Sequence, residues 1–200
     1  MEYKVNKSDV SIDHLIDNGL FEPQRVAHSY LTVDFGEKGL VDIHGRQIGA
    51  AGDITEGVEF TPDNLLRLSL SSHGMPNHSG EVIKIRKGNE EIKFNGQETF
   101  EDIDIAWTDW IGADIENVVA AWDGLRYNPV TGFSYPAKNY KKYGTIVQYS
   151  PDGKIVRTWK LMGIWLNAVK FGDYNRSNND HREISATIHV DKAYPEIRQL

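Results

Sequence analysis

The sequence predicts a mainly β fold, a β-sandwich or barrel-like domain with one flanking α-helix and a short N-terminal helix. Three observations predict it. Several stretches alternate apolar and polar residues with the period of a strand. One stretch spaces its apolar residues by three and four, as one face of a helix requires. Turns rich in glycine and proline separate these stretches, as they do in sandwiches and barrels.

The size and composition fit one soluble domain. The chain has 200 residues, a formal net charge of −7 and no cysteine. This length predicts a single domain over residues 1–200, with a loop-rich candidate insertion around residues 40–79. The lack of cysteine excludes disulfides and thiolate chemistry and suits assembly in a reducing cytoplasm. We expect no signal peptide and no membrane span, because no apolar run is long enough.

The N-terminal third predicts a helix followed by a strand. Residues 8–18 have helical apolar spacing, and Gly19 is placed to end the helix. Residues 26–35 change to period two and put Leu31 and Phe35 on one face. A long strand is therefore expected there.

The next segment is the hardest to assign. Residues 40–79 contain several glycines and prolines, so we expect mostly loop with short strands at 40–43 and 66–71. Residues 81–86 and 91–94 flank the sequence KGNE, which predicts a β-hairpin.

The second half predicts one helix between strands. Residues 100–107 alternate cleanly and predict a strand. The helix stripe consists of Ile115, Val118, Val119, Trp122 and Leu125. After it, strands are expected at 145–149 and 154–161, joined by a Pro-Asp-Gly turn, and at 167–171 and 183–190.

No constellation points to catalysis, a metal or a cofactor. His73 and His78 lie in a loop without carboxylates at ligand spacing, so a metal site is not expected. Asp102 and Asp104 alternate with isoleucines on one strand and are expected to face water, whereas a glycosidase needs carboxylates opposed across a cleft. We expect no enzyme.

Aromatic residues without an evident core role indicate an interaction surface, because tryptophan and tyrosine are enriched at interfaces. Several lie in the loop 127–143 together with lysines. The candidate subunit-interface residues are Trp110, Tyr135, Tyr140, Lys141, Tyr143 and Trp165.

Taken together, the segments resemble the tail tube proteins of contractile-tailed, T-even-like bacteriophages. Residues 16–23 (IDNGLFEP) are similar to that family's entry into its first strand, and residues 94–102 (FNGQETFED) to its lead into a long strand. Residues 140–142 (YKK), with the hairpin after them, and 161–165 (LMGIW) also look like family elements. The resemblance covers 95–191 well and the first forty residues loosely. Leu166 departs from the family's usual proline, and 40–79 has no counterpart.

The resemblance implies a tail-tube fold and a structural role. Six copies would form a ring, and rings would stack into a hollow inner tube inside a contractile sheath, through which phage DNA passes without specific binding. The implied partners are the chain itself, the sheath protein, and the tube-initiating baseplate and tail-terminating proteins. The implied location is the virion tail, after synthesis in the host cytoplasm. An acidic lumen would repel DNA phosphates, and alternation makes Asp34, Asp102 and Asp104 candidates to line it.

Two alternatives remain open. The chain could be a tube initiator, a terminator, or a ring protein of a phage-derived injection machine. More remotely, it could be a carbohydrate-binding β-sandwich that uses exposed aromatics such as Trp110 and Tyr135.

Overall fold

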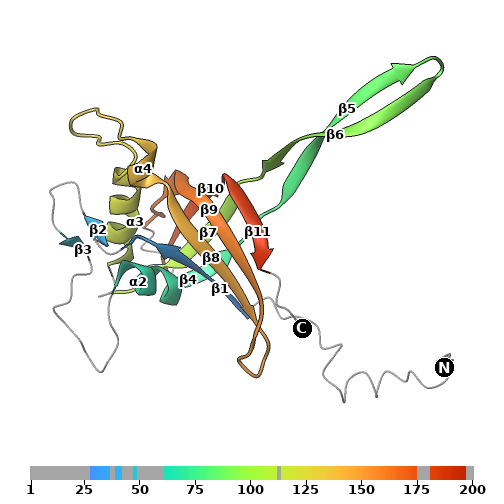
Figure 1. Cartoon of the computed structure of the whole chain (residues 1–200). Helices are drawn as coiled ribbons and strands as arrows, with labels where there is room; N and C mark the ends of the chain where they lie inside the picture. Colours follow the sequence, from blue (N-terminus) through green and yellow to red (C-terminus); the bar gives the residue numbers. More distant parts are fainter. Residues whose placement is uncertain are drawn as a thin grey trace, which may run out of the picture.

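The computed structural model describes residues 28–36, 39–41, 47–48, 61–111, 114–174 and 181–196. Over these residues the chain is mainly β, with most of its strands in one twisted sheet and helices gathered at one end (Figure 1). The helix expected at residues 8–18 lies outside the described residues.

The main sheet has seven antiparallel strands. Its order is β1 (Ser29–Asp34), β8 (Lys142–Tyr149), β9 (Ile155–Lys170), β10 (Glu183–His189), β7 (Ile103–Thr108) and β4 (Leu70–His73), while β11 (Lys192–Glu196) also pairs with β9. Strand β9 divides this main sheet into two smaller sheets that both include it: one contains β1, β8, β9 and β11, and the other β9, β10, β7 and β4. The sandwich or barrel-like prediction is confirmed, although the strands do not close into a complete barrel.

Strand β9 is longer than predicted. We expected strands at 154–161 and 167–171, but a single strand runs from Ile155 to Lys170. Gly163 lies in its middle with φ of +66°. Along the edge of β9 that does not pair with β8, β11 is the partner before this glycine and β10 is the partner after it. The positive φ of Gly163, which residues with a side chain rarely adopt, therefore marks the point where the partner changes, and the strand continues through it.

The predicted central helix is confirmed as α3 (Ile115–Gly124). Ile115, Val118, Val119 and Trp122 are buried, as the stripe required. The ring of Trp122 meets Phe35 edge-on, with centroids 5.5 Å apart. The core therefore joins α3 to the face of β1 that alternation predicted.

The strand expected at 66–71 is wrong in its first half. Residues Pro62–Leu68 form helix α2, and β4 begins only at Leu70. Thr61 caps the helix by accepting a hydrogen bond from the Asn64 amide at 3.4 Å, and Pro62 suits a first helical position. The Thr61 cap and Pro62 favour the start of a helix here, and the apolar run that follows continues this helix instead of forming a strand.

Two smaller features complete the body. Strands β2 (Leu40–Val41) and β3 (Gln47–Ile48) form a separate pair. Helix α4 (Ala137–Tyr140) is one turn within the segment expected to be loop. With α2, the described residues thus contain more helix than the single flanking helix predicted.

The predicted hairpin is present and much longer than expected. Strand β5 (His78–Lys87) pairs with β6 (Glu90–Phe100) and with no other described strand. Figure 1 shows this pair projecting from the body as an arm. We call β5 and β6 together the arm.

Candidate assembly surfaces

The arm carries an apolar face that nothing in the described chain covers. Ile83 lies opposite Phe94, and Ile85 lies opposite Ile92. Opposed residues of an antiparallel pair share a face, so these four side chains form one stripe. Their exposed fractions lie between 43% and 52%. Apolar burial in the monomer therefore does not explain this pattern.

The opposite face of the arm is charged. Lys84 lies opposite Lys93, and Arg86 opposite Glu91. On this face an ion pair joins Lys84 Nζ to Glu91 Oε1 at 3.8 Å, and the lysine side chain is 58% exposed. The arm is thus amphipathic like a half-buried strand pair, yet both of its faces meet solvent.

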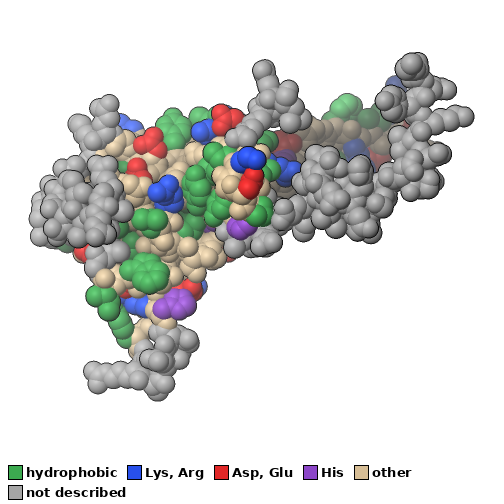
Figure 2. Space-filling model, turned by 90° about the horizontal axis from the view of Figure 1, so that it is seen from below, with side chains coloured by type: hydrophobic (Ala, Val, Ile, Leu, Met, Phe, Trp, Pro, Cys, Tyr) green, Lys and Arg blue, Asp and Glu red, His purple; other side chains and the backbone are tan. Residues whose placement is uncertain are grey.

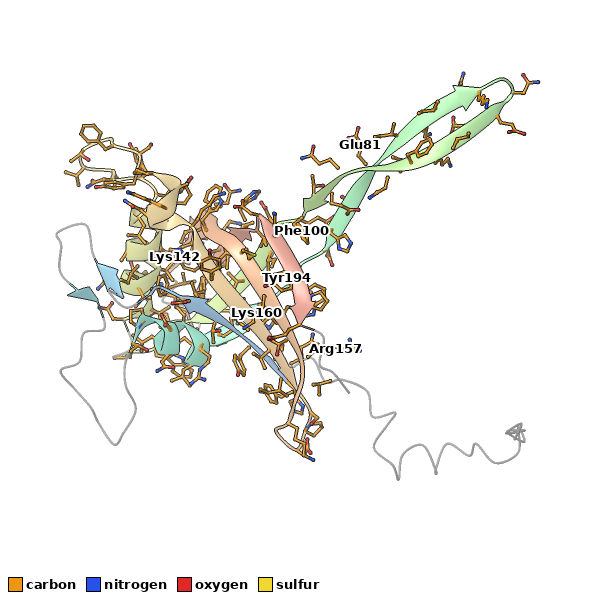
Figure 3. All side chains as sticks on the ribbon, viewed as in Figure 1. Glu81, Phe100, Lys142, Arg157, Lys160 and Tyr194 are labelled. Atoms are coloured by element: carbon orange, nitrogen blue, oxygen red, sulfur yellow. The ribbon has the colours of Figure 1, made fainter. Side chains whose placement is uncertain are left out.

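A bulge interrupts the register of the arm near its root. Gly80 lies opposite Glu98 and Val82 opposite Asn95, so between these pairs Glu81 of β5 faces two residues of β6, Gly96 and Gln97. A Cβ at Gly96 would come 2.8 Å from the Glu81 carbonyl oxygen, so the backbones can approach only because residue 96 is glycine. Figure 3 shows Glu81 on the arm and Phe100 where the arm meets the body.

A second exposed apolar surface lies on the loop 127–135. Asn128 shapes this loop, because its Oδ1 accepts hydrogen bonds from the amides of Val130 at 2.9 Å and Thr131 at 3.2 Å. The loop holds Val130 at 77% and Phe133 at 68% exposure. The hydrogen bonds of Asn128 thus hold the loop in a conformation that exposes Val130 and Phe133 to solvent.

The predicted interface residues divide into two groups. Tyr140 and Trp165 pack together, with ring centroids 5.7 Å apart, and the ring of His189 lies 5.3 Å from that of Trp165. Lys141 beside them is bound to Asp191, with Nζ 2.5 Å from Oδ2. These three candidates are half-buried and make their contacts within the protomer.

The other three candidates, Trp110, Tyr135 and Tyr143, are exposed. They make no ring contact with one another in the described part of the chain. The sequence therefore found exposed aromatics, but it missed the apolar face of the arm. A signal was available in the sequence: a hairpin around the KGNE turn pairs Ile83 with Phe94 and Ile85 with Ile92, which puts all four on one face.

The acidic candidates for a channel wall lie on two different sheets. Asp104 accepts a hydrogen bond from Thr187 at 3.0 Å, and Asp102 lies 2.6 Å from Nδ1 of His189, both on the outer face of the β7 and β10 pair. Asp34 lies at the end of β1, with β8, β9 and β10 between it and β7 in the strand order. The three acidic residues thus lie on different parts of the main sheet, and they stay candidates for the channel wall.

No described side chains form a group of three or more metal-ligating residues. No helix within the described ranges is long and apolar enough to span a bilayer. On the face visible in Figure 2, basic, acidic and hydrophobic side chains are interspersed, which differs from the basic stripe typical of nucleic-acid binders.

Comparison with solved structures places this architecture among known ones. A chain of the anti-feeding prophage cap, which terminates the tube of that particle, matches with a TM-score of 0.61 at 12% identity, over 99% of this chain and 100% of that chain. A chain of the PVC sheath–tube complex, from an extracellular contractile injection system in its extended state, matches with a TM-score of 0.59 at 15% identity. That match covers 93% of this chain and 97% of the other.

The chain has the fold of tube-related proteins of contractile injection systems. A chain of the PVC sheath/tube terminator agrees, with a TM-score of 0.58 at 14% identity over 88% of this chain and 98% of that one. The sequence itself matches no protein-family model and no curated protein. The predicted tube fold is therefore confirmed by shape, at identities too low to carry a function with it.

Proposed function

We propose that this chain is a structural, non-catalytic subunit of a contractile phage tail. Copies join into hexameric rings, and the rings stack into the hollow inner tube through which the phage delivers its DNA. The observation that carries the proposal is the solvent-exposed apolar face of the arm. The tube fold supports it. The subunit is made in the host cytoplasm and resides in the virion tail.

The arm supports assembly because a two-stranded hairpin alone is only marginally stable in water. Its apolar stripe gains free energy when a partner covers it, at roughly 25 cal/mol for each Å² buried. A second copy is the partner present at the same concentration as the arm. An arm that docks on a different patch of its neighbour makes a heterologous contact, which gives rings or open stacks.

Electron microscopy and sedimentation of the purified protein test the proposal. We expect rings or tubes for the unmodified chain. Ile83→Ser with Phe94→Ser should leave the body folded and abolish assembly, because it removes half of the apolar stripe. Lys84→Ser with Lys93→Ser, at a matched position on the charged face, should still assemble. A chain that stays monomeric at every concentration and salt refutes the proposal.

The proposed partners are the sheath protein around the tube and the proteins that start and end it at the baseplate and neck. A tube-terminating role is the second candidate, because the tube-terminating cap matches over 99% of this chain. Polymerisation without a template separates the two. A tube subunit forms long tubes alone, whereas a terminator stops at single rings.

We place Asp102 and Asp104 on the channel wall. Among the described residues, the outer face of their sheet carries these two carboxylates and Glu183, against one lysine, Lys170. An excess of carboxylates would repel DNA phosphates and let the genome slide. On the other sheet, Asp34 and Glu196 are balanced by Lys160 and Lys192.

DNA retention by assembled tubes tests this wall. Tubes carrying Asp102→Lys and Asp104→Lys should retain short DNA fragments at low salt. Tubes with Asp34→Lys should release the fragments like the unmodified tube. If Asp34→Lys alone causes retention, the other sheet lines the channel.

Trp110, Tyr135 and Tyr143 are proposed as further subunit contacts. Trp110 is 57% exposed, and truncating a large exposed aromatic at an interface typically weakens binding strongly. Trp110→Ala should lower assembly without lowering the melting temperature of the monomer. Binding of sugars on a glycan array, lost in Trp110→Ala, would instead favour the carbohydrate-binding alternative.

A further inference from the structure

The root of the arm carries carboxylates that have no ion-pair partner in the described part of the chain. Glu81 lies in the bulge, Glu98 lies opposite Gly80, and Glu101 follows the last residue of β6. All three are exposed. Their one side-chain hydrogen bond joins Glu98 Oε1 to the Asn95 amide at 3.1 Å. Three uncompensated negative charges therefore gather where the arm leaves the body.

A complementary cluster of lysines surrounds a cavity of about 520 Å³ at the junction of α4, β8, β9 and β11. Lys138, Lys141, Lys142 and Lys192 line it, and the only acid among them is Asp191. Asp191 is bound to Lys141. The other three lysines have no ion pair with any residue that the structure describes. We call Lys138, Lys142 and Lys192 the lysine cluster.

One member of the cluster is held partly away from water. Burial lowers the pKa of the Lys142 ammonium, and the nearby Asp34 carboxylate opposes this shift. A half-buried cation without an ion pair gains more from an approaching carboxylate than a fully solvated one does. The cavity therefore favours an anionic occupant.

The two charge groups cannot meet within one chain. Figure 3 shows Glu81 and Lys142 far apart, on the arm and on the body. The arm has no strand partner beyond its own two strands, so no described element holds it against the body. Any contact between the two groups must join different copies.

We infer that the lysine cluster of one copy receives the acidic arm root of a second copy. The inference rests on the proposed self-assembly and names its electrostatic contact. Each copy carries both the three lysines and the three glutamates, none of which has an ion-pair partner in the described part of the chain. Every copy can therefore supply either half of the contact. Because the halves are different patches, the contact is head to tail and can repeat indefinitely.

Charge reversal tests the inference. Lys138→Glu, Lys142→Glu and Lys192→Glu together should raise the concentration needed for half-assembly by about tenfold or more. Glu81→Lys, Glu98→Lys and Glu101→Lys together should do the same. The combination of all six should recover assembly to within about threefold of the unmodified chain.

The matched control changes charge elsewhere. Lys154→Glu with Arg157→Glu also makes the chain more acidic, at exposed positions of the β8–β9 hairpin outside the cavity. It should assemble normally. Far-ultraviolet circular dichroism verifies folding, and the milder Lys142→Gln gives a smaller loss of assembly if a triple variant misfolds.

Engineered disulfides give an independent readout, because the chain has no cysteine of its own. Glu98→Cys with Lys142→Cys should yield a ladder of covalent oligomers under oxidation. A covalent dimer alone would overturn the head-to-tail contact.

Three further results overturn the inference in distinguishable ways. If the unmodified chain never assembles, the proposed function fails with it. If the chain assembles and all charge reversals are silent, only the inference fails. If short DNA binds the unmodified chain, and the lysine-cluster variant loses this binding but still assembles, the cavity receives nucleic acid.

Discussion

Ser29 Oγ lies 2.9 Å from Nε2 of His73, and this hydrogen bond joins the two end strands of the main sheet. Nδ1 of the same imidazole lies 2.9 Å from the Gly74 carbonyl oxygen, to which it can only donate. In the neutral ring Nε2 therefore accepts the Ser29 hydroxyl proton. β1 and β4 approach each other through side chains, without a backbone ladder between them.

Removing the Ser29 hydroxyl should destabilise the contact between β1 and β4. We expect Ser29→Ala to lower the free energy of unfolding by about 1 kcal/mol, because the half-buried imidazole loses its partner. Urea denaturation followed by tryptophan fluorescence measures it. Ser71→Ala is the control, since its hydroxyl bonds the exposed Glu183 carboxylate and should cost much less. Equal losses in the two variants would contradict the assignment.

Gly163 should tolerate no side chain. Its φ of +66° is strained for other residues, and a Cβ would collide with the Asp191 carboxylate. Gly163→Ala should therefore destabilise the fold by about 2–3 kcal/mol. Gly153→Ala, at φ of +80° with open space around it, should cost only about 1 kcal/mol. Thermal melts of both variants give the comparison, and similar shifts would show that the collision is relieved cheaply.

Arg182 ties three parts of the fold together. Its Nη1 lies 2.8 Å from Asp109 and 2.7 Å from Glu116, and its Nε donates to the Phe171 carbonyl at 2.9 Å. The side chain is only 12% exposed. We expect Arg182→Gln to cost about 2–3 kcal/mol in chemical denaturation. Lys160→Gln breaks a 3.9 Å exposed pair with Glu196 and should cost less than about 1 kcal/mol.

Asp63 should make stability depend on acidic pH. Burial raises the pKa of this carboxyl above its ordinary value of 3.8, and the Asp34 charge adds to the rise. The native state thus holds its proton more tightly than the unfolded chain, so stability is lost as pH rises through this window. Melting temperatures of Asp63→Asn relative to the unmodified chain should rise from pH 3 to pH 7.

The same pH series in an Asp34→Asn background supplies the control for Asp63. Removing the neighbouring charge should shrink the pH-dependent difference, because one cause of the raised pKa is gone. A difference that stays flat with pH in the original background would refute the role of Asp63.

Elements with a local signal could be predicted from the sequence. The strand at Ile103–Thr108 followed from its alternation, because Ile103, Ile105 and Trp107 all face the core. Helix α3 followed from its apolar stripe, and the arm's turn from the KGNE sequence. In each case the pattern that selects the element lies within about ten residues.

Elements that depend on distant partners could not be predicted. The apolar run at 66–71 fits a helix or a strand, and packing of Leu65 and Leu66 into the core accompanies the helical outcome. The continuity of β9 through Gly163 requires β10 and β11 to pair with it in succession. Among candidate site residues, exposure of Trp110 could be anticipated, whereas the packing of Tyr140 on Trp165 could not.

By itself, the sequence determined an acidic, mainly β chain with one clear amphipathic helix and a hairpin around the KGNE turn. Only the tertiary structure decided that this hairpin stands away from the body, and that its four apolar residues share a face that meets solvent. The physical reason is that alternation fixes which side chains share a face of a strand pair. Whether that face is covered depends on the other parts of the chain that fold beside it.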